Sequence, residues 1–340
     1  MSGDGGIARR IVLRSSEFRK EREASWRELD ELVVRVEKRG VAALSAAEIE
    51  KLPMLYRVAL SSLSVARSIA LDRHLLAYLE SLAFRAYLAV YGPRISFLQG
   101  TADFLRRGLP RAVRAARWHV LVAALAVAVG TLAGFLLVQA DESWFGALVP
   151  SGLIEGRGPA STRDDLLRHE IFAPWEGVAS SLALLANFLF SNNSVVGILA
   201  FGLGIAGGVP TLFLLAYQGL ALGAFIALHA QRGLIVEFLG WISIHGVSEI
   251  TALILCGAAG LMIGEKVLFP GRYTRLDSLA LHGRVAAQIV IGAVLLFFVA
   301  AILEGCFRQL VQSTEWRFLV GGGTGLLWLL YFTLAGRGRS

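Results

Sequence analysis

The chain has 340 residues, of which 55% are hydrophobic and only 17% are charged, and its formal net charge is +7. A soluble protein of this length rarely combines so few charges with so much apolar content, so the composition excludes an ordinary soluble globular protein. The positive charge does not indicate a nucleic-acid partner, because the excess of Lys and Arg in the cytoplasmic parts of membrane proteins accounts for it.

The charges are unevenly distributed along the chain. Residues 1–117 hold 21 of the 33 Lys and Arg residues and 13 of the 26 acids. This asymmetry predicts a basic cytoplasmic domain (1–105), a basic juxtamembrane segment (106–117) and a membrane domain (118–340). Residues 1–39 lack the apolar stretch of a secretory signal, which predicts that the N-terminus stays in the cytoplasm.

The N-terminal domain has the pattern of a helical bundle. Residues 11–39 place apolar side chains at helical spacing among charged residues, and Gly40 follows as a C-cap. Ser45 and Glu48 have the spacing of a capping box that starts a second helix, and residues 55–91 continue as one or two helices. The pattern contains no catalytic pairing, so we expect a solvated helical domain.

A basic run precedes the first apolar segment. It consists of Arg106, Arg107, Arg111, Arg114 and Arg117. Such a run fixes the orientation of the following span by the positive-inside rule, and Trp118 lies where an interfacial aromatic residue belongs. The run could also bind anionic lipid head groups, although topology alone explains it.

The rest of the chain predicts an all-α polytopic membrane protein. Six apolar segments are close to the ~20 residues that cross a bilayer, although the second is short. They are residues 118–138, 194–209, 211–230, 239–263, 285–304 and 317–335. The acidic outer loop 139–177 is expected outside, whereas the basic connection 264–284 and the C-terminal tail are expected inside. We therefore expect a multi-pass protein of the cytoplasmic membrane with both termini in the cytoplasm.

Residues 178–191 are apolar but only 14 residues long. A run of this length is more typical of a re-entrant or interfacial helix than of a span. Counting it as a span would make the number of crossings odd and place the basic tail outside. The segment is therefore predicted to lie at, or dip into, the outer face.

Polar residues inside the predicted spans form the candidate site. The topology brings Asn192, Asn193, His245, Glu249 and Glu304 to the outer half of three spans, where ionisable groups are costly to insert. Either they join helices by hydrogen bonds, or they line a cavity that binds a proton, an ion or a polar ligand. The first alternative is favoured. The His-x-x-x-Glu pair lacks a third ligand of fixed spacing, so no metal site, cofactor or catalytic residue is predicted.

Glycines recur at short intervals in the second and third spans. The candidate packing or hinge residues are Gly204, Gly207, Gly208, Pro210, Gly219 and Gly223. Small residues four positions apart let membrane helices pack closely, and this use is favoured. The Gly-Gly-Val-Pro run also interrupts the helix, which predicts a tight inner turn or a hinge.

These motifs follow one another in a fixed order. They are Phe190, Asn192-Asn193, the Gly-rich run 200–211, Gln218-Gly219, Leu222-Gly223-Ala224, His245-Gly246-Val247, Glu249, Pro270-Gly271 and Glu304. In this order the chain resembles the stage II sporulation protein M family of bacterial and archaeal membrane proteins. Trp26 and Leu52-Pro53 extend the resemblance to the longer members, while Gln218 stands where an Asn is usual.

The resemblance implies a non-enzymatic scaffold or assembly protein. The sporulation member holds peptidoglycan-degrading partners, whereas genes of longer relatives often accompany those of a MoxR-type ATPase, von Willebrand A-type proteins and an RDD-type membrane protein. Expected partners are membrane lipids, a second copy of the chain or other cell-envelope proteins, and not nucleic acid. The alternative is a channel or transporter whose site is the polar cluster. An intramembrane hydrolase is disfavoured because no nucleophile completes it.

Overall fold

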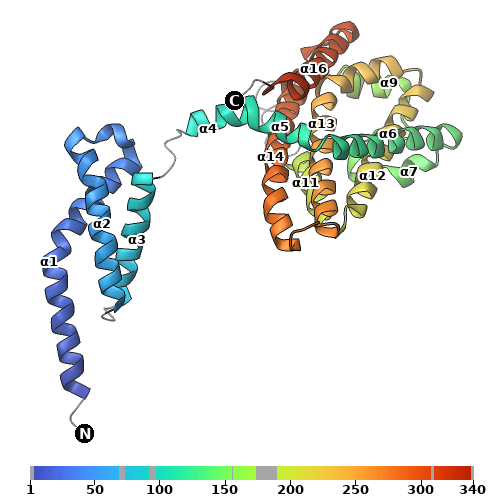
Figure 1. The fold of residues 1–340 in the computed structure, drawn as a ribbon. Coiled ribbons are helices and arrows are strands. Elements are labelled where there is room, and N and C mark those ends of the chain that lie inside the picture. Colours follow the sequence, from blue (N-terminus) through green and yellow to red (C-terminus); the bar gives the residue numbers. More distant parts are fainter. Residues whose placement is uncertain are drawn as a thin grey trace. The chain divides into compact units, whose positions relative to one another are not determined.

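The structure is a computed structural model that describes residues 4–68, 73–91, 97–154, 156–173, 190–307 and 310–337. Every regular element within these ranges is a helix, so the predicted all-α class is confirmed. The chain divides into two compact units, Met1–Phe97 and Leu98–Ser340 (Figure 1). Residues 98–105 thus belong to the second unit, and the predicted short helix 178–191 lies almost entirely outside the described residues.

The first unit is a bundle of three helices, each packed against the other two. They are α1 (Asp4–Arg39), α2 (Ala46–Ser68) and α3 (Arg73–Tyr91), with a short 3-10 turn, η1 (Val41–Ala43), after α1. Trp26 and Leu29 of α1 meet Leu79 and Leu82 of α3 in one hydrophobic core, and all four side chains are buried. The apolar periodicity seen in the sequence is therefore the periodicity of this core.

The turn between α1 and α2 contains the two predicted caps. Gly40 follows α1 with a φ of 76°, a left-handed conformation that glycine adopts without strain. The Ser45 amide donates a hydrogen bond to the Glu48 carboxylate at 2.8 Å, and the Glu48 amide donates to Ser45 Oγ at 3.4 Å. The hydrogen bonds from Ser45, together with that from Arg35 of α1, lower the pKa of Glu48 to about 2.

The second unit begins with α4 (Phe97–Asp103), a π-helical turn, η2 (Phe104–Gly108), and α5 (Leu109–Ala115). Five of its described helices are long and apolar enough to cross a membrane. They are α6 (Arg117–Ala140), α12 (Val209–Gln231), α13 (Ile235–Leu268), α14 (Arg275–Ile302) and α16 (Thr314–Leu334). The predicted second span is the shorter α11 (Phe190–Gly202), which continues into a 3-10 turn, η5 (Leu203–Ala206).

Two predicted connections contain more helix than expected. The acidic loop after α6 carries α7 (Trp144–Leu148), α8 (Ser151–Ile154), α9 (Arg163–Leu166) and a π-helical turn, η3 (Leu167–Ile171). The basic connection after α13 shortens to residues 269–274, because both flanking helices continue past their apolar segments. Charged side chains can extend a helix beyond the hydrocarbon zone, so hydropathy alone underestimated these helices.

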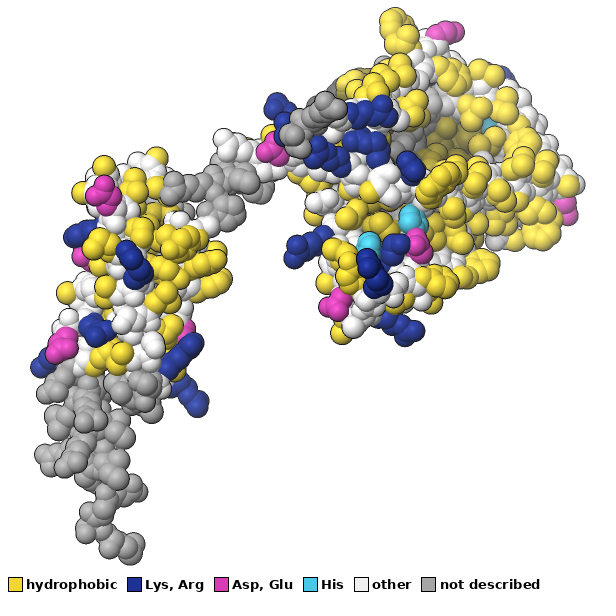
Figure 2. Space-filling model, viewed as in Figure 1, with side chains coloured by type: hydrophobic (Ala, Val, Ile, Leu, Met, Phe, Trp, Pro, Cys, Tyr) yellow, Lys and Arg dark blue, Asp and Glu magenta, His cyan; other side chains and the backbone are white. Residues whose placement is uncertain are grey.

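Contacts between helix ends define two sides of the second unit. On one side, His119 at the start of α6 meets Glu265 near the end of α13 at 2.7 Å, so we call it the His119 side. On the other, Arg232 after α12 binds Glu142 after α6 at 2.6 Å, and this is the Arg232 side. In Figure 2, Lys and Arg gather where α5 and the α13–α14 connection lie, which is the His119 side.

Glycines bring the backbones of α6 and α12 into direct contact. A Cβ atom built on Gly219 or Gly223 of α12 would lie 2.2 Å from the Val127 carbonyl oxygen or 2.0 Å from that of Thr131. Gly130 and Gly134 of α6 face α12 with the same closeness, so neither helix tolerates a side chain here. Close backbone approach of this kind is a principal source of helix association in lipid.

A second close backbone contact joins the turn between α11 and α12 to α13. A Cβ atom on Gly204 would lie 2.1 Å from the Gly260 carbonyl oxygen, so the chain leading into α12 rests directly on α13. Gly207 and Gly208 then adopt φ values of 83° and 81°, and Pro210 occupies the first turn of α12. Two successive left-handed residues turn the chain sharply between the 3-10 turn and α12.

We predict that Gly223→Ala destabilises the second unit by about 1–3 kcal/mol, because the methyl group would collide with the α6 backbone. The matched control is Gly283→Ala in α14, where a Cβ atom would meet nothing within 4 Å. Thermal unfolding in one detergent compares the two proteins. An equal unfolding midpoint for both variants would contradict the packing described here.

Candidate functional site

α13 carries the centre of the candidate site. It has 34 residues and packs against α6, α11, α12, α14 and α16. His245 and Glu249 lie one turn apart on it and therefore project from the same face. Gly246 between them is buried and also lines the cavity, and a Cβ atom built on it would lie 3.3 Å from the Ile242 side chain.

Glu304 joins His245 and Glu249 to form a three-residue cluster, which we call the His-Glu-Glu cluster. The His245 Nε2 atom lies 3.7 Å from Glu304 Oε1. One ligand atom from each of the three residues lies within 4.8 Å of the other two. His245 and Glu304 are only 5% and 8% exposed, whereas Glu249 is half-buried.

A change of helix type positions Glu304. The α-helical hydrogen bonding of α14 ends at Ile302, and Leu303–Phe307 continues as a π-helical turn, η6. A π turn holds an extra residue and therefore rotates the following side chains relative to a regular α-helix. Helical periodicity could not have placed Glu304 opposite His245, because that periodicity changes just before Glu304.

The cluster lines a cavity of about 250 Å³. Asn193 of α11 and Gln218 of α12 contribute amides to its wall, and Arg157 from the loop on the Arg232 side contributes a guanidinium group. Phe225, Phe238 and Trp241 are among the apolar lining residues. The cavity therefore combines apolar walls with a few convergent polar groups, as small-molecule and ion sites do.

Aromatic rings hold the imidazole of His245 in place. The Trp241 ring meets it edge-on with centroids 6.1 Å apart, and Phe238 packs next to Trp241 at 5.8 Å. Phe238 in turn stacks on His229 of α12 at 3.8 Å. The position of His245 is thus fixed by a chain of rings that links α13 to α12.

The structure brings together four of the five residues in the predicted polar site. Asn193, His245, Glu249 and Glu304 line one cavity. Asn192 lies in α11, and its side chain is outside the described residues. The first two turns of α13 and the loop that follows α6 both adjoin the cavity, so it lies in the half of the unit nearer the Arg232 side.

The cluster has the donor groups of a cation site. Imidazole nitrogen and carboxylate oxygen are both common metal ligands. The sequence predicted no metal site because His245 and Glu249 lacked a third ligand at fixed spacing. Glu304 supplies a third candidate from a different helix, at a spacing that no local motif encodes.

The five predicted basic residues all lie at the start of the second unit. Arg106 and Arg107 lie in the π-helical turn, Arg111 and Arg114 in α5, and Arg117 begins α6. Arg114 donates to the Phe332 carbonyl oxygen at 2.8 Å and Arg111 to that of Gly336 at 3.1 Å. These two arginines thus satisfy carbonyl groups at the C-terminal end of α16, where a positive charge is favourable.

Sequence reasoning missed three polar residues. Arg157 and Gln218 line the cavity, and Arg317 of α16 is fully buried. Arg317 donates to the carbonyl oxygens of Val311 at 2.6 Å and Ile171 at 2.7 Å, which ties the loop after α6 to α16. The sequence could have indicated two of them, because Gln218 lies within an apolar segment and Arg317 at the edge of one, where polar residues are costly.

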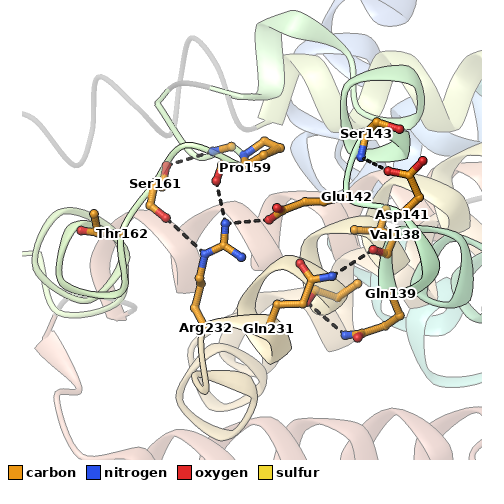
Figure 3. Close-up of polar contacts among 12 residues, drawn as sticks. Val138, Gln139, Asp141, Glu142, Ser143, Pro159, Ser161, Thr162, Gln231 and Arg232 are labelled. Atoms are coloured by element: carbon orange, nitrogen blue, oxygen red, sulfur yellow. Dashed lines mark hydrogen bonds and ion pairs between the residues drawn. The ribbon is translucent and has the colours of Figure 1, made fainter.

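A polar network closes the Arg232 side, as Figure 3 shows. The Arg232 guanidinium donates to the Glu142 carboxylate and the Pro159 carbonyl oxygen, each at 2.6 Å, and to the Ser161 carbonyl oxygen at 3.3 Å. Gln231 adds a hydrogen bond to the Val138 carbonyl oxygen at 2.9 Å. Arg232 therefore holds the loop that contains Arg157 against the ends of α6 and α12.

We predict that Arg232→Gln releases this loop, because three acceptors lose a charged donor, each bond contributing about 1.5–3 kcal/mol. The loop between residues 142 and 161 should exchange amide hydrogens faster in hydrogen-exchange mass spectrometry. Arg163→Gln, at an exposed position in α9, is the control and should leave the exchange unchanged. Equal exchange in both variants would show that other contacts hold the loop.

Comparison with known proteins identifies the second unit. Residues 122–307, more than half of the chain, match the family described as Stage II sporulation protein M, and residues 16–92 match a domain of unknown function (DUF8413). No curated protein and no solved structure matches the chain. The first of these matches includes all the polar cavity residues described above. The chain belongs to the stage II sporulation protein M family.

Proposed function

We propose that this membrane protein binds a small cation in the cavity of its second unit and carries it across the membrane. The observation that supports the proposal most is that α11, α12, α13 and the π-helical turn after α14 each contribute a polar residue to the lining of one cavity. Discontinuous or glycine-rich helices with convergent polar groups are typical of transporter sites. This favours the channel or transporter alternative over a purely structural role for the cluster.

The charges of the lining favour a cation over an anion. Glu249 and Glu304 supply two carboxylates, and the amide oxygens of Asn193 and Gln218 add neutral acceptors. The opposing charge of Arg157 lies 5.4 Å from the centre of the Phe225 ring, and its guanidinium donates to the Leu153 carbonyl oxygen at 2.9 Å. Carboxylates are costly inside a membrane, and two that line one cavity favour a positively charged ligand.

The cavity adjoins the side from which a solute would enter. Leu153 and Arg157, from the loop after α6, contribute to its lining. The basic run at the start of the unit lies on the opposite, His119 side. If basic residues face the cytoplasm, as the positive-inside rule predicts, the cavity receives its ligand from outside the cell.

The test is a measurement of cation currents in proteoliposomes on a solid-supported membrane, with concentration jumps of H⁺, Na⁺, K⁺, Mn²⁺ and Zn²⁺. The full chain should give a current with at least one of these ions. Glu249→Gln should reduce it at least about tenfold, because the amide keeps the shape but removes a charge from the site. Glu237→Gln, on the same helix but outside the cavity lining, should leave the current unchanged.

Currents equal to those of protein-free liposomes for all five ions would refute cation transport. A current that Glu249→Gln and Glu237→Gln reduce equally would refute the assignment of the cavity as its route. Reconstitution efficiency is checked by the amount of protein recovered in the liposomes, so that a lower current is not mistaken for lost protein.

A scaffold role is the second candidate, and the surface of the first unit favours it. Phe84, Tyr87, Leu88 and Tyr91 lie along one face of α3 and are 64%, 48%, 48% and 62% exposed. Tyr56 of α2 joins them, with its ring 5.9 Å from that of Tyr91. Figure 2 shows hydrophobic side chains gathered over this unit. Exposed apolar patches of this kind mark protein-interaction sites.

The scaffold candidate predicts that the double change Phe84→Ser and Tyr91→Ser removes partner proteins recovered after mild detergent extraction and affinity purification. Val58→Ser is the control, because Val58 is 41% exposed and lies two residues from Tyr56, on a different face of α2. Partners identified by mass spectrometry should persist in the control and fall severalfold in the double variant. An identical set of proteins in both samples would contradict a docking role for this face. The link to a MoxR-type ATPase and homo-oligomer formation remain predictions.

A further inference from the structure

We infer that the His-Glu-Glu cluster is a binding site for one divalent transition-metal ion. This inference rests on the proposed function in using the same cavity, and it narrows the class of cation. The ligands would be one imidazole nitrogen of His245 and one carboxylate oxygen each from Glu249 and Glu304. Two of these residues lie on α13 and the third on the turn after α14, so the ion would join two helices.

The distances between the ligand atoms of the three residues are close to those in a metal-bound site. Ligand atoms around a tetrahedral ion lie roughly 3.3–3.6 Å apart when metal–ligand bonds are about 2.0–2.2 Å long. His245 Nε2 and Glu304 Oε1 are 3.7 Å apart, and no ligand atom of the three lies more than 4.8 Å from another. Rotation of one or two carboxylate groups therefore closes the set around an ion without a shift of the helices.

The charge of the cluster matches a divalent ion. Two carboxylates and a neutral imidazole carry a charge of −2, which one M²⁺ ion balances within the cavity. Two carboxylates whose oxygens lie within 4.8 Å of each other repel, and a cation between them relieves that repulsion. Arg157 also lines the cavity, donates to the Leu153 carbonyl oxygen and lies over the Phe225 ring, and its single charge balances at most one of the two carboxylates.

The cavity leaves coordination positions open to further ligands. Three protein ligands with an open fourth position are the pattern of exchangeable or catalytic metal sites, whereas structural sites are closed. The lining amides of Asn193 and Gln218 offer oxygen atoms that water or the ion can reach on the way in or out. An ion held by three protein ligands beside a cavity can leave again, which transport requires.

The mixture of ligands selects the class of metal. An imidazole nitrogen favours zinc, iron or manganese over magnesium and calcium, which prefer oxygen ligands throughout. The Cys256 thiol is buried on α13 and is absent from the cavity lining. We therefore assign the site to a borderline divalent ion and use Zn²⁺ as the probe.

The test is equilibrium binding of Zn²⁺ to the full chain in detergent after removal of metal with a chelator. Bound zinc is measured by mass spectrometry with inductively coupled plasma. The wild-type protein should bind about one Zn²⁺ per chain. Glu249→Gln, Glu304→Gln and His245→Ala should each weaken binding at least about tenfold, whereas Glu237→Gln should bind as the wild type does.

Two further measurements keep the test independent of folding defects in the variants. Zn²⁺ should raise the unfolding temperature of the wild-type chain, because a ligand that binds the folded state stabilises it. Co²⁺ should give a visible absorption band in the wild-type chain, and Glu249→Gln, whose side chain is the least buried of the three, should change that band.

Absence of stoichiometric zinc, unchanged binding in all three cluster variants, or displacement of Zn²⁺ by equimolar Mg²⁺ or Ca²⁺ would each overturn the site. The outcomes also separate this inference from the proposed function. Cation currents without zinc binding would reject the metal site and leave transport in place. Tight zinc binding without currents for any cation would reject transport and leave the metal site in place.

Discussion

The second unit depends on direct contact between helix backbones at glycine positions. Lipid supplies no hydrophobic force between helices, so their association rests on close packing and hydrogen bonds. The carbonyl oxygens of Val127 and Thr131 on α6 approach Gly219 and Gly223 of α12 as no side chain would allow. α13 meets the turn before α12 in the same way through Gly260. These backbone contacts set the distances between α6, α12 and α13 without any contribution from polar side chains.

These glycine contacts form a rigid frame of α6, α12 and α13. The frame can offset the cost of placing polar groups within an apolar unit. The His-Glu-Glu cluster lies on α13 and the turn after α14. The frame holds α13 against α11 and α12, and the turn after α14 packs against α13. Arg317 and Arg232 secure the loops on the same side through backbone carbonyl groups. The elements that line the cavity are therefore themselves held in place, which fixes the spacing of its polar groups.

The fold was largely predictable from the sequence, because hydropathy and charge report directly on the bilayer. The five long helices lie where apolar segments were expected, and the capping box of Ser45 and Glu48 appears as its spacing predicted. The ends of α13 and α14 could not be read from hydropathy, since they continue as helix beyond the apolar zone. Arg157 could not be placed either, because no local pattern tells that a loop folds back over a cavity.

The shape of the site favours a ligand over a merely structural role for its polar residues. Side chains that only join helices need contact with one another, and measured gains from such bonds average about 0.6 kcal/mol. Here a π-helical turn places Glu304 so that one of its oxygens lies within 4.8 Å of ligand atoms of His245 and Glu249, and two ionised carboxylates at such a distance repel each other. A cation that enters this cavity would attract both carboxylates at once.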